Sequence, residues 1–345
     1  HQEWEAGEMQ IRRVLAAPDK FKGTATAEEV ARAIGHACWD RGIECVEIPL
    51  ADGGDGLLDA LGGANRTSTV TGPLGDPVQA DWRLSRGTAV IEMARASGLV
   101  LAGGAEGNDP IAASTTGTGE LIDHALDAGA TRIIVGLGGS ATTDGGFGAI
   151  RAITAIARLK QVELLVACDV TTTFLDAARV FGPQKGASPA QVKLLTRRLE
   201  RLGQMFDEEF GIDVRDIPGG GAAGGIGGAL AALGGRLIPG FELVADEKDL
   251  FDQLSGTDLI ITGEGALDAT SFDGKVVGGV IGLADEEQIP VAAIVGGPVD
   301  ESDLEDRPLG MVVSLSELYG TDRAVDRPTR CIEDAAGQLR DRLSS

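Results

Sequence analysis

The sequence contains few aromatic residues and almost no histidine. Phe, Trp and Tyr together account for 4% of the 345 residues, and one of the three histidines stands at position 1. The other two, His36 and His124, fall on predicted helices, so a histidine base or nucleophile is not expected. The low aromatic content disfavours an aromatic-rich β-sandwich. The 51 glycines instead favour an α/β protein with many tight turns between strands and helices.

Cysteine is also scarce. The four cysteines are scattered, without a CxxC pair or the spacing of metal ligands. A zinc site is therefore not expected, and the pattern is typical of reduced thiols in a cytoplasmic protein. Residues 1–8 lack the basic and apolar regions of a signal peptide. We expect residues 1–9 to be a disordered N-terminal extension outside the fold, and the sequence does not show whether it is native.

Positive charge is in short supply, with 30 basic against 53 acidic residues and a formal net charge of −23. This balance argues against nucleic acid and against an anionic membrane as partners, because both attract basic surfaces. No hydrophobic run approaches the roughly 18 residues of a membrane span. We therefore expect a small-molecule substrate. For the number of subunits, monomer and homodimer both remain open. If that substrate is anionic, locally placed cations and backbone N–H groups must hold it.

The beginning of the chain has the pattern of a βαβ unit. Residues 14–17 form a short apolar run, and Thr26 with Glu29 forms a capping-box pattern before a helix that stops at Gly42. A second apolar run over residues 45–50 predicts another strand. Two strands around one helix imply a parallel sheet. Later apolar runs predict three more strands in the same pattern, at residues 259–262, 291–295 and 311–314.

A different pattern separates the two parts of this sheet. Three strand-like segments at residues 67–71, 78–84 and 89–93 follow one another closely, as in an antiparallel meander. We therefore predict a Rossmann- or flavodoxin-like parallel-sheet domain with an inserted second α/β domain, and an active site in the cleft between them. The predicted boundaries are residues 10–62 plus 245–345 for the first domain and 63–244 for the insertion.

Lysine is used selectively. Only seven of the 30 basic residues are lysines, yet four of them lie in or beside glycine-containing loops: Lys20, Lys22, Lys185 and Lys275. A compact ammonium beside bare backbone N–H groups suits phosphate oxygens. The alternative interpretation, four solvated lysines near turns, is plausible for each one singly and much less so for all four.

Acidic residues follow several of the predicted strands. They are Asp19, Asp52, Asp55, Asp144, Asp169, Glu264 and Asp268. Carboxylates at the carboxyl ends of parallel strands converge where α/β proteins bind ligands. Phosphoryl transfer needs such groups to hold Mg²⁺ and to orient the attacking hydroxyl. Asp beside Gly also caps helices and fills turns, and for Asp55 and Asp144 this structural interpretation has at least equal weight.

Two glycine-rich stretches remain. Gly138–Thr142 follows an apolar strand and can offer backbone N–H groups to an anion. Gly219, Gly221 and Gly224 formally match GxGxxG, but no strand precedes them, so we do not assign a nicotinamide site. This stretch is expected either to open a helix over residues 226–233 whose N-terminus faces phosphate, or to be a flexible hinge. A GxxxxGK[ST] loop, the protein-kinase motifs and a GxSxG elbow are all missing.

In order along the chain, these loops resemble those of the bacterial glycerate kinase family, the type I glycerate kinases. The shared motifs include Ala-Pro-Asp-Lys-Phe-Lys-Gly (17–23), Ala-Asp-Gly-Gly-Asp-Gly (51–56), Gly-Gly-Ser-Ala-Thr-Thr-Asp-Gly-Gly (138–146), Cys-Asp-Val (168–170), Phe-Gly-Pro-Gln-Lys-Gly (181–186), Ile-Thr-Gly-Glu-Gly (261–265) and Asp-Gly-Lys-Val (273–276). The resemblance implies a kinase that uses ATP and Mg²⁺ to convert D-glycerate to phosphoglycerate, usually 2-phosphoglycerate, in a cleft between two α/β domains.

The site residues carried over are those that stand in the shared motifs. As catalytic groups we take Asp169, Lys185, Lys22 and Lys20. As groups that bind substrate or nucleotide we take Asp19, Gly53, Gly54, Gly139, Ser140, Asp144, Glu264 and Lys275, and as metal ligands Asp52 and Glu264. The resemblance marks these positions without assigning each a role. A kinase for a related hydroxy acid, a non-catalytic sugar-acid binding protein and a nucleotide-dependent oxidoreductase remain as alternatives.

Overall fold

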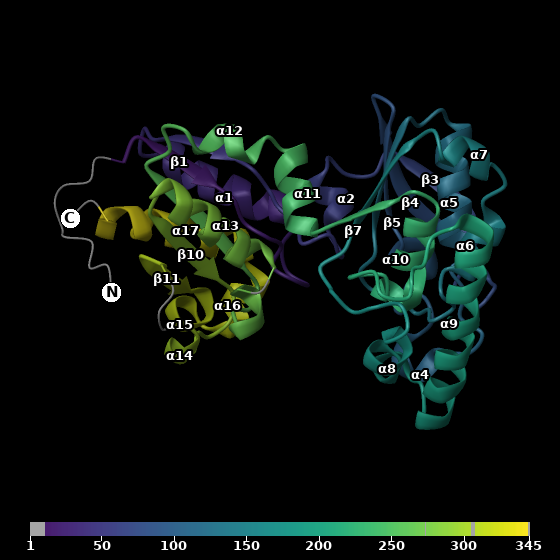
Figure 1. Cartoon of the computed structure of the whole chain (residues 1–345). Coiled ribbons are helices and arrows are strands. Elements are labelled where there is room, and N and C mark those ends of the chain that lie inside the picture. The colour runs from purple at the N-terminus through teal and green to yellow at the C-terminus, as the bar shows by residue number, and fades with distance from the viewer. Residues whose placement is uncertain (1–10, 273, 305–307, 344–345) are drawn as a thin grey trace. The chain divides into compact units, whose positions relative to one another are not determined.

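A computed structural model describes residues 11–272, 274–304 and 308–343 (Figure 1). The described chain forms two compact units. Unit 1 is drawn from residues 1–52, 59–61 and 241–345, and unit 2 consists of residues 53–58 and 62–240. The N-terminal extension expected over residues 1–9 lies outside the described residues. No helix among the described residues is both long and apolar enough to cross a membrane.

Unit 1 is built on a five-stranded parallel sheet, as the sequence predicts. Its strands, in spatial order, are β11 (Met311–Ser314), β10 (Val291–Val295), β9 (Leu259–Glu264), β1 (Arg13–Ala16) and β2 (Glu44–Glu47). In the register of the central strand, Leu15 pairs with Val46 on one side and with Ile260 on the other. All neighbouring strands run in the same direction, so their carboxyl ends share one edge.

Helices cover both faces of this sheet, which explains why its strands are continuous apolar runs. Val14 and Ala16 belong to a buried cluster with residues of α1 (Ala27–Trp39) and α17 (Pro328–Leu343). Leu15 points to the opposite face, where α12 (Leu250–Leu254) and α13 (Val276–Glu287) pack. The other helices of unit 1 are α11 (Gly240–Glu247), the 3₁₀ helix η2 (Ala269–Phe272), α14 (Glu301–Leu304), α15 (Leu315–Tyr319) and α16 (Thr321–Asp326). The short helix α2 (Leu57–Ala60) contributes two residues to each unit.

The start of α1 confirms the predicted capping box. The Thr26 hydroxyl accepts a hydrogen bond from the Glu29 amide at 3.2 Å, and the Glu29 carboxylate accepts one from the Thr26 amide at 2.9 Å. Two amides that the helix itself leaves without partners are satisfied in this way. Cys38, Cys45, Cys168 and Cys331 are all buried as free thiols.

Unit 2 is built on a six-stranded mixed sheet. Its strands, in spatial order, are β3 (Arg66–Thr71), β4 (Pro77–Ser85), β5 (Thr88–Glu92), β6 (Arg132–Gly136), β7 (Glu163–Ala167) and β8 (Arg236–Ile238). The first three strands pair antiparallel, which confirms the predicted meander. From β5 to β8 the pairing is parallel. The short strand β8 was not predicted, because three residues between glycines and a proline carry no periodic signal.

The helices of unit 2 are mostly short. They are α3 (Ala94–Ser97), α4 (Gly104–Gly107), α5 (Thr116–Asp127), α6 (Phe147–Ala152), α7 (Ile156–Leu159), α8 (Ala177–Phe181), the 3₁₀ helix η1 (Pro183–Lys185), α9 (Pro189–Phe210) and α10 (Ala222–Ala232). The long helix α9 buries Leu195, Leu199 and Phe206, three apolar residues at helical spacing. Phe206 packs on Phe174 with ring centroids 5.9 Å apart.

The second glycine-rich stretch forms a tight bend at the start of α10. Ala223, Gly224 and Gly225 all have positive φ, so the regular helix begins at Ile226, where the sequence predicts it. A side chain on Gly224 would overlap the carbonyl oxygen of Thr142, and the Gly145 amide donates to the Gly224 carbonyl at 2.9 Å. Because this bend is buried and closely packed, it does not fit the hinge alternative.

We predict that removing the cap of α9 destabilises unit 2. The Ser188 hydroxyl accepts from the Gln191 amide, and the Gln191 side chain accepts from the Ser188 amide at 2.8 Å. Ser188→Ala should lower the free energy of unfolding by about 1 kcal/mol, as measured by urea denaturation. Ser188→Asp keeps an acceptor and should remain near wild type. An equal loss in both variants would contradict this role of the hydroxyl.

Candidate active site

Unit 1 has a pocket at the carboxyl edge of its sheet. The pocket has a volume of about 500 Å³ and is lined by the loops that follow β1, β2, β9 and β10 together with residues of α15 and α16. Seven residues that the sequence analysis singles out line it: Asp19, Lys20, Lys22, Asp52, Glu264, Asp268 and Lys275. The parallel arrangement of the strands brings together side chains that are up to 256 positions apart in the sequence, Asp19 and Lys275 being the outermost.

Glycine allows these loops to approach one another closely. The Asp19 amide donates to the carbonyl of Gly263 at 2.8 Å, which fixes the loop after β1 against β9. A Cβ on Gly265 would lie 3.1 Å from the Lys22 amide nitrogen, and one on Gly263 would overlap the Ile294 carbonyl. The loop with Lys20 and Lys22 therefore lies directly against bare backbone, the environment in which phosphate oxygens are bound.

Burial makes the carboxyl groups of this pocket weaker acids than usual. It raises the pKa of Asp19 to about 6, against the opposing effect of Lys20, and repulsion from Asp52 adds to the rise. Burial likewise raises the pKa of Glu264 to about 7, although a hydrogen bond from Ser271 and the Lys275 ammonium oppose the shift. Both groups would ionise more readily if a cation were bound beside them.

One carboxylate oxygen in the pocket has an unfilled hydrogen-bonding capacity. Oε1 of Glu264 is buried and has no hydrogen-bond partner among the described residues. No three Asp, Glu, His or Cys side chains in the described part of the chain are grouped closely enough to hold a metal ion by themselves. The buried, unpartnered oxygen of Glu264 fits Mg²⁺, which is commonly held by one or two carboxylates together with water and substrate phosphates.

Unit 2 places a second group of predicted residues at the carboxyl ends of β6 and β7. Asp169 follows β7, and one of its oxygens accepts a hydrogen bond from the Gly240 amide at 2.7 Å. A Cβ on Gly53 would lie 2.8 Å from the Ala167 Cβ and 3.4 Å from the other Asp169 oxygen. A Cβ on Gly138 would lie 2.5 Å from the Gly54 Cα, so these two glycines pack directly against each other. Asp169 is exposed to solvent, and the Gly240 amide fixes one of its carboxylate oxygens.

Lys185 is the buried cation of unit 2. Its side chain is 3% exposed, and its ammonium donates to Ser140 Oγ at 2.8 Å and to the Thr142 carbonyl at 2.7 Å. Burial lowers the pKa of Lys185 to about 7, while the carboxylate of Asp144 opposes the shift. Gly139, next to Ser140, is exposed. An anion bound beside this ammonium would restore its charge.

Asp144 has a different environment from the other predicted carboxylates. Its oxygens accept from the amide and hydroxyl of Thr115 at 2.9 and 2.8 Å, and from the amides of Gly146 and Gly148 at 3.1 Å each. These four bonds tie the loop after β6 to the starts of α5 and α6. They match the structural interpretation that the sequence left open for this residue.

Several residues of these sites carry no signal in the sequence. The side chain of Asn108 donates to the Lys185 carbonyl at 2.9 Å and to the Ala141 carbonyl at 3.0 Å, and so contacts two loops that lie 77 and 33 positions further along the chain. Ser316 and Thr321 line the pocket of unit 1 from α15 and α16. Each lies in a polar segment where such residues are common, so the sequence does not distinguish them as residues of a site.

The burial of Lys185 predicts a pH dependence of stability. Its pKa is lower in the folded protein than in the unfolded chain, so the unfolded chain binds more protons between about pH 7 and 10. Stability relative to Lys185→Met should therefore rise with pH in this window, by up to about 1.4 kcal/mol per pH unit. Urea denaturation of both proteins between pH 7.5 and 9.5 measures it. Parallel curves would show that the folded protein keeps this lysine charged.

The chain is similar to known proteins over most of its length. The sequence model described as "Glycerate kinase family" matches residues 14–156 and 153–344. The "Glycerate 2-kinase" of Escherichia coli (strain K12) is 40% identical over 329 residues, which cover 84% of this chain and 86% of the relative. The "Glycerate kinase" of Halalkalibacterium halodurans is also 40% identical, over 331 residues that cover 83% of this chain and 86% of the relative.

A solved structure extends the likeness to three dimensions. The crystal structure of a "putative glycerate kinase 2" from Salmonella typhimurium LT2 superposes with a TM-score of 0.79 at 34% sequence identity. The match covers 97% of this chain and all of the other. Two α/β units with parallel strands are therefore the architecture of a solved relative as well. By sequence and by fold, the chain belongs to the glycerate kinase family.

Proposed function

We propose that this protein is a cytoplasmic kinase that transfers the γ-phosphoryl group of ATP to a hydroxyl of D-glycerate and forms 2-phosphoglycerate. The names of the relatives support glycerate as the acceptor, and the Escherichia coli relative is named a glycerate 2-kinase. The single structural observation that carries the proposal is the pocket of unit 1, in which three lysines and four carboxylates gather at a glycine-lined edge. The number of subunits, monomer or homodimer, stays a prediction.

The pocket of unit 1 is proposed to hold the nucleotide phosphates. Lys20, Lys22 and Lys275 supply compact positive charge, and the backbone of the adjoining glycine loops supplies N–H groups. These local donors are required because the net charge of −23 repels an anion at long range. Asp52 and Glu264 would hold Mg²⁺, and the unpartnered oxygen of Glu264 is the atom best suited to this. Bound there, Mg²⁺ would neutralise charge that develops on the transferring phosphoryl group.

The loops of unit 2 are proposed to serve the acceptor. Asp169 would orient the attacking hydroxyl and receive its proton as the new oxygen–phosphorus bond forms and the bond from the γ-phosphorus to the β,γ-bridging oxygen breaks. Lys185, held by Ser140 and the Thr142 carbonyl, would offset the negative charge of glycerate or of the phosphoryl group. Because the transition state of phosphoryl transfer is loose, such positioning contributes more than a strong base.

The oxidoreductase alternative has little structural support. The GxGxxG residues follow an irregular segment and not a strand. Their glycines serve close packing: Gly221 against the Thr173 carbonyl and Gly224 against the Thr142 carbonyl. A dinucleotide site requires a strand directly before this motif. Two alternatives remain. A kinase for another short hydroxy acid would phosphorylate that acid instead of glycerate, and a non-catalytic binding protein would phosphorylate neither, so an activity assay distinguishes them.

We expect ADP to form only when ATP, Mg²⁺ and D-glycerate are all present, in a coupled assay with a panel of short hydroxy acids. Lys185→Met and Asp169→Asn should each lower kcat by about 10²–10³, since each removes one charge contact at the reaction centre. Lys193→Met removes an exposed lysine of α9 and serves as the control. Folded variants with near-normal kcat would refute the assigned roles, and preferential turnover of another acid would change the substrate.

The raised pKa of Glu264 predicts that nucleotide binding depends on pH. A protonated carboxyl cannot hold Mg²⁺, so the affinity for Mg²⁺–ATP should rise as pH increases through about 7, by at most tenfold per pH unit. Asp19, with a pKa of about 6, extends the dependence to lower pH. Isothermal titration calorimetry from pH 5.5 to 8 measures this. Glu264→Gln should bind more weakly and vary less with pH, and an unchanged slope would exclude Glu264 as a ligand.

A further inference from the structure

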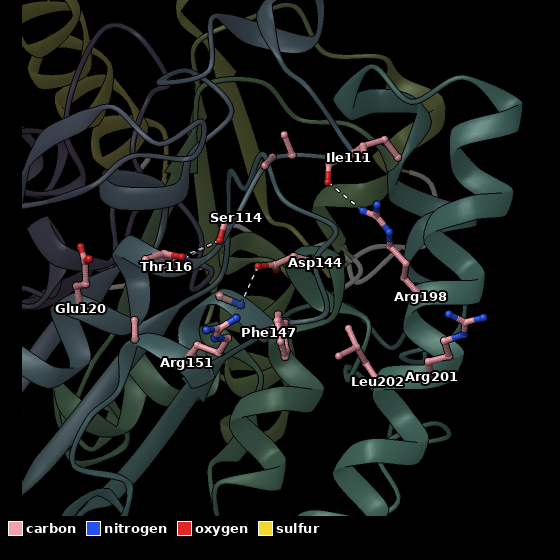
Figure 2. A pocket seen from close by; sticks show the side chains of 14 residues that line it. Ile111, Ser114, Thr116, Glu120, Asp144, Phe147, Arg151, Arg198, Arg201 and Leu202 are labelled. Atoms are coloured by element: carbon pink, nitrogen blue, oxygen red, sulfur yellow. Dashed lines mark hydrogen bonds between the residues drawn. The ribbon is translucent and has the colours of Figure 1, made fainter.

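Unit 2 contains a second pocket that the proposed function does not use. It has a volume of about 740 Å³ and is formed by α9, α6, the start of α5 and the segment that precedes α5 (Figure 2). Of the site residues predicted from the sequence, Asp144 alone lines it. All its lining residues belong to unit 2.

Three arginines surround this pocket. Arg198 and Arg201 come from α9, and Arg151 comes from α6 (Figure 2). The described part of the chain contains no ion pair to any of the three. Arg198 donates to the Ile111 carbonyl at 3.0 Å, and the Arg151 guanidinium lies 5.6 Å from the centre of the Phe147 ring. In a chain with 53 acidic residues, three arginines without a carboxylate partner at one pocket leave positive charge available to a ligand.

The two carboxylates that line the pocket are occupied by donors of the protein. Asp144 accepts the four hydrogen bonds described above. Glu120 accepts from the Thr71 amide at 2.6 Å and from the Thr71 hydroxyl at 2.9 Å. In the described part of the chain, neither carboxylate forms an ion pair with an arginine. The lining contains three cationic side chains and two anionic ones. A bound anion would therefore meet a local excess of positive charge despite the acidity of the whole chain.

Between the charged groups the lining is largely apolar. It includes Ala113, Ala152, Leu202 and the exposed face of Phe147, with the hydroxyls of Ser114 and Thr116 beside them. Figure 2 shows Leu202 of α9 and Phe147 of α6 on facing sides, below the segment that ends at Ser114. Apolar walls with a few polar groups are typical of small-molecule sites, and arginine is suited to bidentate contact with carboxylate or phosphate.

We propose that this pocket binds a small organic anion, with a phosphate or carboxylate head held by Arg198 and Arg201 and an apolar body packed against Phe147 and Leu202. Because neither arginine belongs to the proposed catalytic groups, the proposal does not depend on the proposed function.

Phenyl phosphate is a suitable probe, because it combines an anionic head with an apolar ring. We expect saturable binding to the full-length protein in calorimetry, with a non-hydrolysable ATP analogue, Mg²⁺ and D-glycerate present at saturation to occupy the proposed active site. Inorganic phosphate and phenol, which each carry half of the probe's chemistry, should both bind at least tenfold more weakly. The affinity for phenylacetate, which carries a carboxylate, compares that head group with phosphate.

The matched variants remove the same charge from the same helix. Arg198→Gln/Arg201→Gln should weaken phenyl phosphate binding at least tenfold, since it removes two charged contacts. Lys193→Gln/Arg197→Gln also removes two exposed cations of α9, but neither lines the pocket, so it should bind as wild type does. Urea denaturation confirms that both double variants are folded, and Leu202→Ala tests the apolar wall if the arginine variant is not.

Four outcomes would overturn the proposal. They are the absence of saturable binding with or without D-glycerate, equal binding by the two double variants, binding of the probe only when D-glycerate is left out, and binding of inorganic phosphate as tight as that of phenyl phosphate. The first two exclude the arginines as a binding site. The third would show that the pocket is part of the acceptor site. The fourth would show that the apolar walls contribute nothing to binding.

Discussion

The architecture depends on direct backbone-to-backbone contact at the carboxyl ends of the strands. At Gly263 in unit 1 and at Gly53 and Gly224 in unit 2, neighbouring backbone occupies the space that a Cβ would need. The loops that carry the candidate site residues are pressed together at these places. This packing exposes amide groups beside lysines and carboxylates and also fixes where those side chains can lie. Glycine is thus required where these loops meet the strand ends, and Gly263 is itself part of β9.

Packing at this density also sets the electrostatics. Asp19, Glu264 and Lys185 lie where water is largely excluded, so each charge is costly until a partner arrives. In the absence of ligand, the two carboxyl groups hold protons more strongly than usual and the ammonium holds its proton less strongly. Anions and cations that bind there regain the interaction energy that the protein lacks alone. A chain with a strongly negative surface can therefore still attract phosphate at short range.

Much of the fold could be predicted from the sequence because its signals are local. Continuous apolar runs predict the five strands of unit 1, and the pair Thr26 with Glu29 predicts the start of α1. The candidate site was predictable only in part. Lysines and carboxylates in glycine loops could be named, but the burial of Lys185 and the four bonds of Asp144 depend on the packing of distant segments. Arg151, Arg198 and Arg201 stand on ordinary amphipathic helices, and nothing in their neighbourhood in the sequence marks them.

The four buried thiols have a practical consequence for the study of motion. Cys38, Cys45 and Cys331 lie in unit 1 and Cys168 lies in unit 2, all shielded from solvent. A thiol reagent can modify them only when the surrounding structure opens, so the rate of labelling reports the frequency of that opening. Cys168 directly precedes Asp169, so its labelling reports local opening at this strand end. Mass spectrometry of the labelled peptides distinguishes this opening from that of unit 1, without any added probe.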